Sequence, residues 1–196
     1  DMVDYARMKF RLVKENTLQT SLYSSVDVIT PYATPWRVIM SAEKATELIE
    51  NNNLVMNLNP ENEIKETSWI NPGKVIRVTR LTQADAIKCV DFAAERGLQY
   101  IHLDSGWYGS EVLMSSDATS VADNRDLDMP KLINYATSKG IGVWVYVNQR
   151  ALVQQLDELL PLYRKWGLKG IKFGFVQIGN QHWSTWLHDA IRKCAE

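Results

Sequence analysis

Two residues of a short apolar run could take part in chemistry. Lys172 and Gly174 lie two positions apart in residues 170–176. A lysine in an apolar strand needs a partner or solvent, because burying an unpaired ammonium is unfavourable. Side chains alternate along a strand, so both positions point to one side, and in a parallel barrel this places an ammonium beside a gap at the catalytic end. The alternative is that Lys172 extends to solvent and Gly174 relieves a packing clash.

A second candidate group follows an earlier strand. Asp104 ends an apolar run and is followed, after a glycine, by Trp107 and Tyr108. A carboxylate accepts hydrogen bonds from sugar hydroxyls, and an aromatic ring stacks on a sugar face. The loop over residues 108–129 is longer than a connection requires, which favours a binding role. The alternative is that Asp104 caps the loop backbone above a packed tryptophan.

Further candidates are selected by position, because working residues of parallel barrels lie at the carboxyl ends of strands. They are Arg77 and Thr79 after the first strand, Asn148, Gln149 and Arg150 after the third, and residues 172–177 on the fourth. His102 falls within a strand and is expected to be a core histidine with its hydrogen bonds satisfied. No metalloprotease, serine hydrolase, P-loop or dinucleotide-binding motif occurs.

The elements that would position these residues follow a repeated pattern. Three times a predicted helix stops at a glycine and a strand begins just after it, at residues 97–104, 140–148 and 167–173. This is typical of the helix-to-strand junction of a βα unit. The other predicted elements are a strand at 74–78, a helix from its cap at Thr82 to Arg96, and helices at 131–139, 152–166 and 183–195. We therefore predict an α/β fold made of the first four βα units of a (β/α)8 TIM barrel.

The chain before residue 73 has a different pattern. Alternation at residues 8–13 and 18–23, with a polar segment at 14–17 between them, predicts a β-hairpin. Two prolines within residues 30–35 end this strand-rich part. After it we predict a strand at 36–40, a helix at 42–50 capped by Ser41, a short apolar run at 54–59 and a loop at 60–72.

Composition excludes several classes of protein. The net charge is −1, which gives no basic field for nucleic acid or an anionic membrane. Two cysteines far apart indicate neither a zinc site nor a disulfide framework. No apolar run reaches the roughly 18 residues that a membrane-spanning helix needs. Seven Trp and eight Tyr suit sugar stacking, and they suit a core equally well.

Separated motifs, in this order and spacing, closely resemble glycoside hydrolase family 97. They lie at residues 34–37, 58–59, 67–74, 91–95, 104–108 and 172–175. That family contains exo-acting α-glucosidases and α-galactosidases with an N-terminal β-sandwich, a central barrel and a C-terminal β domain. The resemblance implies that residues 1–40 end the sandwich, 41–72 connect, and 73–196 form the first half of the barrel of a longer protein.

The resemblance transfers the family's chemistry only in part. Retaining members carry an aspartate nucleophile where this chain has Gly174. Inverting members also have glycine there, but carry a glutamate base in a His-His-Glu stretch where this chain has Tyr146, Val147 and Asn148. The general acid would lie beyond Glu196. Lys172 is implied to lie near the sugar hydroxyls, together with Asp104, Trp107 and Asn148 as substrate-binding candidates.

Two functions follow as expectations. Glycoside hydrolysis needs two carboxyl groups, roughly 5–5.5 Å or 6.5–9.5 Å apart, and Asp104 is the one well-placed candidate, so this chain alone is expected to be inactive. The first function is an α-glycosidase in the full-length protein, inverting because Gly174 leaves space for water. The second is a carbohydrate-binding or scaffold homologue that has lost catalysis, indicated by Gly174 and Asn148 together.

Other properties are implied by the family alone. It implies a calcium ion, with most ligands outside this chain and no metal site within it. It implies an oligosaccharide substrate and a periplasmic or secreted location. Because half a barrel has open edges, we expect it to fold poorly alone and to associate with its missing half or with itself.

Overall fold

The computed structural model describes residues 8–15, 17–22, 24–34 and 36–196. They divide into two compact units, which are the described residues of Asn71–Gln177 and those of Asp1–Ile70 with Ile178–Glu196. Tyr23 of the predicted hairpin, Asn16 of its turn and Pro35 lie outside the described residues, as do residues 1–7.

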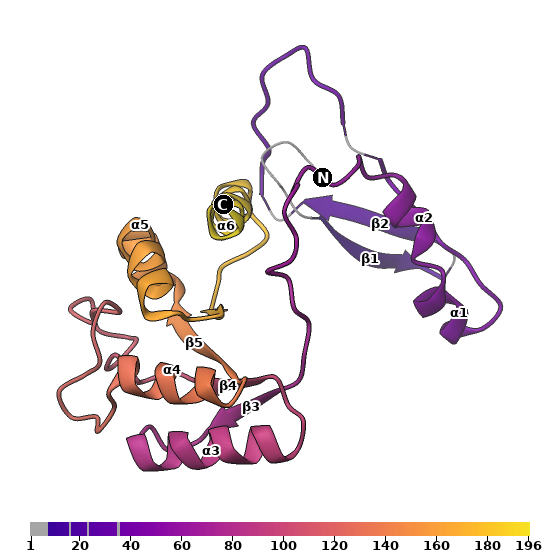
Figure 1. Cartoon of the computed structure of the whole chain (residues 1–196). Helices are drawn as coiled ribbons and strands as arrows, with labels where there is room; N and C mark the ends of the chain where they lie inside the picture. Colours follow the sequence, from indigo (N-terminus) through magenta and orange to yellow (C-terminus); the bar gives the residue numbers. More distant parts are fainter. Residues whose placement is uncertain (1–7, 16, 23, 35) are drawn as a thin grey trace. The chain divides into compact units, whose positions relative to one another are not determined.

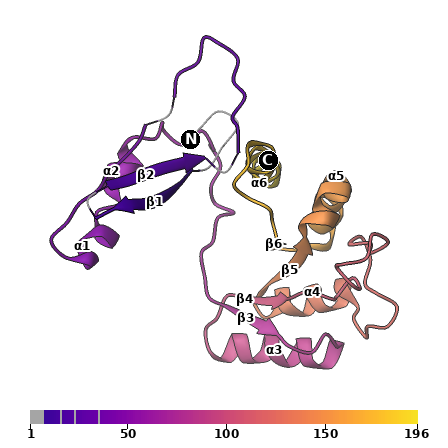
Figure 2. The same ribbon diagram turned by 180° about the vertical axis from the view of Figure 1, so that it is seen from behind.

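The unit Asn71–Gln177 contains a parallel sheet. Its strands are β3 (Val75–Val78), β4 (Tyr100–Leu103), β5 (Gly142–Asn148) and β6 (Gly170–Gly174). They pair in the order β3-β4-β5-β6, which Figures 1 and 2 show from opposite sides. Each pair is parallel. Because the spatial order is also the sequence order, every crossover connection leads to the next strand of the sheet. The predicted α/β class and the four predicted strands are confirmed.

Three helices of this unit begin at side-chain caps. In α3 (Gln83–Glu95) the predicted cap is confirmed, because the Thr82 side chain accepts from the amide of Asp85. Helix α4 (Met129–Ser138) begins two residues before its predicted start, because Asp128 caps it and a proline follows in its first turn. Helix α5 (Gln149–Trp166) begins three residues early, directly after its cap Asn148.

One face of the sheet carries the apolar core. Strand residues of this face are buried, among them Ile101, Leu103, Val143, Val145 and Val147. Helices α3, α4 and α5 all contact the strands, and in Figure 1 α3 and α4 run beside β3 and β4. The amphipathic helices thus cover the apolar face, as expected for a parallel sheet of βα units.

The opposite face is filled by aromatic rings that lie over glycines of the next strand. A Cβ added at Gly142 would lie 2.5 Å from Cδ1 of Tyr100, and one at Gly170 would lie 2.7 Å from Cε2 of Trp144. The rings of Tyr100 and Trp144 are 5.1 Å apart between centroids. On each of these strand pairs the aromatic ring therefore occupies the space that a side chain at the glycine would need. The sequence patterns do not reveal this pairing.

The other unit contains β1 (Met8–Lys14), β2 (Thr17–Leu22), α1 (Ala45–Glu50), α2 (Asn53–Asn57) and α6 (Gln181–Ala195). Strands β1 and β2 pair antiparallel, which confirms the predicted hairpin. The strand predicted at residues 36–40 is wrong, because these residues are irregular and Trp36 and Ile39 are exposed. The predicted cap Ser41 is also wrong, since α1 follows Lys44. The apolar run at 54–59 forms most of α2.

Candidate active site

Ionic groups meet at the carboxyl end of the parallel sheet. The Asp104 carboxylate lies between two cations, with Oδ2 3.0 Å from Nε of Arg77 and Oδ1 3.2 Å from Nζ of Lys172. The Asp104 side chain is 13% exposed, whereas that of Lys172 is 50% exposed. Three different strands or strand ends thus bring Arg77, Asp104 and Lys172 together, and we call them the ion triad.

The ion triad fixes the charge of Asp104. Burial alone would raise the pKa of Asp104, but the Ser105 amide, which donates to Oδ1 over 2.9 Å, and the Lys172 ammonium lower this pKa below its ordinary value. Asp104 is therefore ionised at neutral pH and holds two cations. Such a carboxylate is suited to positioning Lys172 and sugar hydroxyls, and not to donating a proton.

Tyr146 fills the space beside Gly174. A Cβ at Gly174 would overlap the Cε2, Cζ and Oη atoms of Tyr146. The expectation that Gly174 leaves room for an attacking water is therefore wrong, and the alternative, that the glycine relieves a packing clash, is what the structure shows. The same ring lies beside the ion triad, because Nζ of Lys172 is 5.5 Å from its centroid.

The phenol of Tyr146 has two polar neighbours. Its oxygen accepts from Nδ2 of Asn148 over 3.3 Å, and the Glu111 carboxylate lies near enough to act on its ionisation. Burial, and then the interaction with Glu111, raise the pKa of Tyr146 far above its ordinary value. The phenol therefore stays protonated at neutral pH.

The side chain and the backbone amide of Asn148 both form hydrogen bonds within the protein. Its Oδ1 accepts from the amide of Arg150 over 2.9 Å and caps α5, and its own amide donates to the Tyr108 hydroxyl over 3.0 Å. Arg150 in turn donates from Nη1 to the carbonyl of Glu111 over 2.9 Å. These bonds attach the β4–α4 loop to the end of β5.

Trp107 is fully buried. Its Nε1 donates to the Tyr146 carbonyl over 2.7 Å, and its ring packs on Tyr108 and Tyr163 at centroid distances of 5.1 and 6.2 Å. A ring without an exposed face cannot stack on a sugar, so the geometry gives Trp107 a supporting role instead of the stacking role that was expected. The exposed aromatic at this edge is Phe175, which is 80% exposed and has φ of 48°.

The remaining positional candidates divide into supporting and exposed residues. Gln149 is buried, and its Oε1 accepts from the amide of Gln177 over 2.7 Å. Thr79 is exposed. His102 is buried with its Nε2 lacking a partner among the described residues, so the expectation of a fully hydrogen-bonded histidine is wrong. Burial lowers the pKa of His102. The Asp104 carboxylate opposes this shift and the Lys172 and Arg77 cations reinforce it, so the pKa stays below its ordinary value and the imidazole is neutral.

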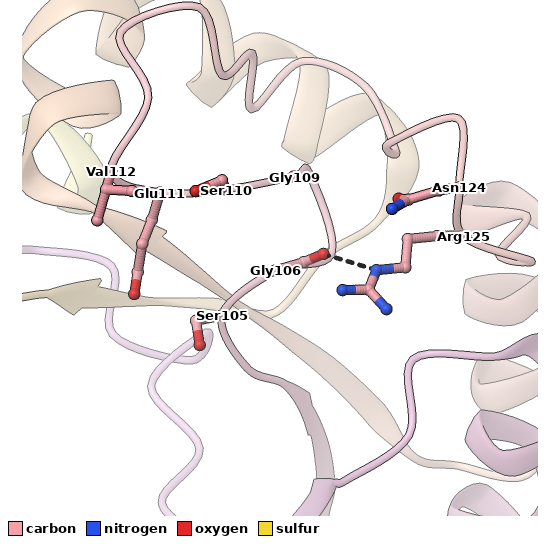
Figure 3. Close-up of a pocket in the computed structure, with 8 residues that line it drawn as sticks. All are labelled: Ser105, Gly106, Gly109, Ser110, Glu111, Val112, Asn124 and Arg125. Carbon is pink, nitrogen blue, oxygen red and sulfur yellow. Dashed lines mark hydrogen bonds between the residues drawn. The ribbon is translucent and has the colours of Figure 1, made fainter.

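A cavity of about 380 Å³ lies in the β4–α4 loop (Figure 3), and Ser105, the residue after Asp104 in the sequence, is part of its lining. Its lining residues are Ser105, Gly106, Gly109, Ser110, Glu111, Val112, Asn124 and Arg125. Sequence reasoning did not find Glu111, because an irregular loop has no periodicity that assigns a direction to its side chains. The length of the loop was the one available signal.

Neither a metal cluster nor a membrane span is found where the structure gives positions. Within the described ranges, no group of three or more His, Cys, Asp or Glu side chains could hold a metal ion. In the same ranges, no helix has both the length and the apolar character needed to cross a bilayer.

The sequence matches two family descriptions. Residues 67–196 match glycoside hydrolase 97, and residues 1–60 match the glycosyl-hydrolase 97 N-terminal domain. A probable retaining α-galactosidase of Streptomyces bingchenggensis (strain BCW-1) is 28% identical over 175 residues, which are 83% of this chain and 26% of that protein. A retaining α-galactosidase of Bacteroides thetaiotaomicron is 26% identical over 198 residues, which are 92% of this chain and 29% of that protein.

A solved structure has the same fold. It is a glycoside hydrolase family 97 enzyme (E480Q) in complex with panose from Pseudoalteromonas sp. strain K8, with a TM-score of 0.77 and 22% identity. The likeness covers 100% of this chain and 36% of that chain. This chain thus spans well under half of each relative. Since the family match covers most of its residues, the chain belongs to glycoside hydrolase family 97.

Proposed function

We propose that the full-length protein is an exo-acting α-glycoside hydrolase that releases a hexose from α-linked galactosides or glucosides. The observation that carries this proposal is the ion triad at the carboxyl end of the sheet, in a chain of family 97. The ammonium of Lys172 is half-exposed and is positioned by Asp104. It can donate to a sugar hydroxyl without losing that partner, because an ammonium has three donors.

We propose that the sheet is the first half of a (β/α)8 barrel. Four parallel strands in sequential order, with helices over the apolar face, support this, as does the likeness to the family 97 structure. The match of residues 1–60 to the family's N-terminal domain supports a β-sandwich before the barrel. The limits 1–40, 41–72 and 73–196 remain our proposed domain boundaries.

The two carboxyl groups that hydrolysis requires are proposed to lie on later strands. Asp104 is occupied by two cations, and Gly174 has no side chain to act as a nucleophile. We propose inversion of configuration, because β6 carries no carboxylate for a double displacement. Tyr146 fills the space at Gly174, so the attacking water and its base would be held by groups outside this chain.

A carbohydrate-binding or scaffold protein without catalysis is a second candidate. It is favoured by the lack of a carboxylate at two positions, since Gly174 is covered by Tyr146 and Asn148 caps α5. Efficient turnover of an aryl α-glycoside by the full-length protein would exclude it.

The function is tested with the full-length protein on para-nitrophenyl α-galactoside and para-nitrophenyl α-glucoside. We expect turnover of one of them, and NMR of the first-formed anomer gives the stereochemical course. Net retention would overturn inversion but not the glycosidase. Absence of turnover, with sugar binding retained, would support the second candidate.

Calcium, location and association are further proposals that rest on the family resemblance or on the open sheet. A calcium ion would need ligands outside this chain, because the described residues offer no suitable cluster. Full-length protein treated with a chelator should then lose activity and regain it with calcium. We place the protein in the periplasm or outside the cell, with this chain associating with the remaining half of its barrel.

A further inference from the structure

The β4–α4 loop forms a cavity with fixed walls. Its outgoing and returning limbs are joined by the Ala122 amide, which donates to the Trp107 carbonyl over 3.0 Å, and by Nε of Arg125, which donates to the Gly106 carbonyl over 2.9 Å. Figure 3 shows this second bond as a dashed line between the two limbs. The volume of about 380 Å³ is typical of a small-molecule site.

The loop is also attached rigidly to the site. Trp107 is fully buried and bonded to the Tyr146 carbonyl, Tyr108 accepts from the Asn148 amide, and Arg150 donates to the Glu111 carbonyl. Three contacts to the end of β5 and the start of α5 therefore fix the cavity relative to the ion triad. Preformed walls reduce the entropy cost of binding a ligand.

The polar lining of the cavity suits sugar hydroxyls. Ser105, Glu111, Asn124 and Arg125 supply a hydroxyl, a carboxylate, an amide and a guanidinium. Figure 3 shows the Glu111 side chain pointing toward the level of Ser105, with Asn124 and Arg125 on the other limb. The lining thus offers both donors and acceptors, as a ring of hydroxyl groups requires.

One oxygen of the Glu111 carboxylate is open to the cavity. The other, Oε2, is buried and lacks a hydrogen-bond partner among the described residues, so a ligand does not reach it. The side chain as a whole is half-buried and lines the cavity, so Oε1 is the oxygen that can accept from a ligand hydroxyl.

We propose that this cavity is the subsite for the leaving-group sugar of an α-linked oligosaccharide, with Glu111 accepting a hydrogen bond from one of its hydroxyls. The proposal rests on the proposed function, in which the released hexose lies over the ion triad. The cavity begins at Ser105, directly after Asp104, and extends into the loop, so it is placed for the neighbouring sugar unit.

The test compares two substrates in the full-length protein. For a galactosidase they are melibiose and para-nitrophenyl α-galactoside, and for a glucosidase maltose and para-nitrophenyl α-glucoside. The nitrophenyl group has no hydroxyls to donate, whereas the second sugar has. In Glu111→Gln we expect the ratio of kcat/KM for the disaccharide to kcat/KM for the aryl glycoside to fall about ten-fold or more, the effect of losing a charged hydrogen bond.

A matched variant controls for loss of charge alone. Glu158 is an exposed carboxylate on α5, and Glu158→Gln should leave the ratio unchanged. Thermal unfolding of each variant checks folding, and Ser105→Ala, on the same cavity, should shift the ratio in the same direction. An unchanged ratio in Glu111→Gln with native thermal stability would overturn the subsite.

Inactive wild-type protein would count against the proposed function and not against the subsite. In that case the wild type and Glu111→Gln are compared by calorimetric titration with the same disaccharide. Binding that is about ten-fold weaker in the variant would support the subsite, and equal binding or no binding by the wild type would overturn it.

Discussion

The ring of Tyr146 lies against the backbone of Gly174, and a Cβ at Gly174 would overlap three of its atoms. The two residues come from neighbouring strands, with Tyr146 opposite Lys172 in the register and Gly174 two residues further along β6. The glycine and the tyrosine therefore form one packing unit. A carboxylate cannot be placed at residue 174 while this ring keeps its position.

Gly174→Ala should destabilise the full-length protein. Inserting a carbon into occupied space typically costs about 1–3 kcal/mol, because the neighbouring side chain must move. Thermal unfolding of Gly174→Ala, Tyr146→Val and the double variant measures the coupling between the two positions. We expect Gly174→Ala to lower the stability clearly less in the Tyr146→Val background than in the wild type.

Gly97→Ala is the matched control for that experiment. Gly97 has φ of 66°, but a Cβ added there would meet no atom within 4 Å, so its alanine variant tests backbone strain alone. Gly97→Ala should lower the free energy of unfolding by the same amount whether residue 146 is tyrosine or valine. If Gly174→Ala lowered the free energy of unfolding equally in both backgrounds, the overlap with the Tyr146 ring would not be the reason for a glycine at position 174.

Lys172→Ala should impair turnover much more than folding. The loss of a hydrogen bond from a charged group to a substrate hydroxyl lowers kcat/KM about ten- to a hundred-fold. Stability should change little, because Arg77 remains bound to Asp104 and the pair is partly exposed. Lys131→Ala, an exposed position on α4, is the control. A much lower melting temperature with wild-type efficiency would show that Lys172 is structural.

Asp104 should contribute to the pH dependence of stability. Its pKa in the folded protein lies below the ordinary value of 3.8, so the unfolded chain binds its proton more readily. The contribution is therefore complete above the unfolded value and is lost as the pH falls through the folded value. Urea unfolding should show Asp104→Asn less stable than the wild type near neutral pH, with the difference shrinking below about pH 4. Asp123→Asn, at an exposed position, is the control for removing a carboxylate from the surface.

The strands and their order could be predicted because apolar runs after glycines are local signals. Residues 74–78, 97–104 and 140–148 each contain the strand that the structure has, and residues 167–173 contain all of β6 except Gly174. The predicted starts of α4 and α5 are two and three residues too late, because apolar spacing alone does not mark the first turn that follows the caps Asp128 and Asn148. Caps are local too, so a closer search for Asp or Asn before each helix would have found them.

The site was predictable in its charges but not in its packing. Lys172 and Asp104 stand out because an ionic group next to an apolar strand needs a partner, and the structure shows that they are partners. The burial of Trp107 and the position of Tyr146 over Gly174 depend on contacts between strands that are distant in sequence. No local pattern encodes those contacts.

Phe175 offers a separate test of sugar stacking. Its φ of 48° is unfavourable for a residue with a Cβ, and its ring is 80% exposed beside the site. Phe175→Gly should therefore keep or raise stability, because glycine adopts this conformation freely. If the ring stacks on substrate, the same variant should raise KM several-fold, and Phe175→Tyr should restore it. Unchanged KM in Phe175→Gly would leave the exposed ring without a role in binding.

The isolated chain should expose apolar surface. Strands β3 and β6 each pair on one side only among the described residues, so each presents an unpaired edge. The face that carries Trp144 and Tyr146 is proposed to be covered by the remaining strands of the barrel. We expect the purified chain of 196 residues to bind an apolar dye and to self-associate in size-exclusion chromatography, in contrast to the full-length protein. A monomer with a cooperative melt and no dye binding would contradict the half-barrel architecture.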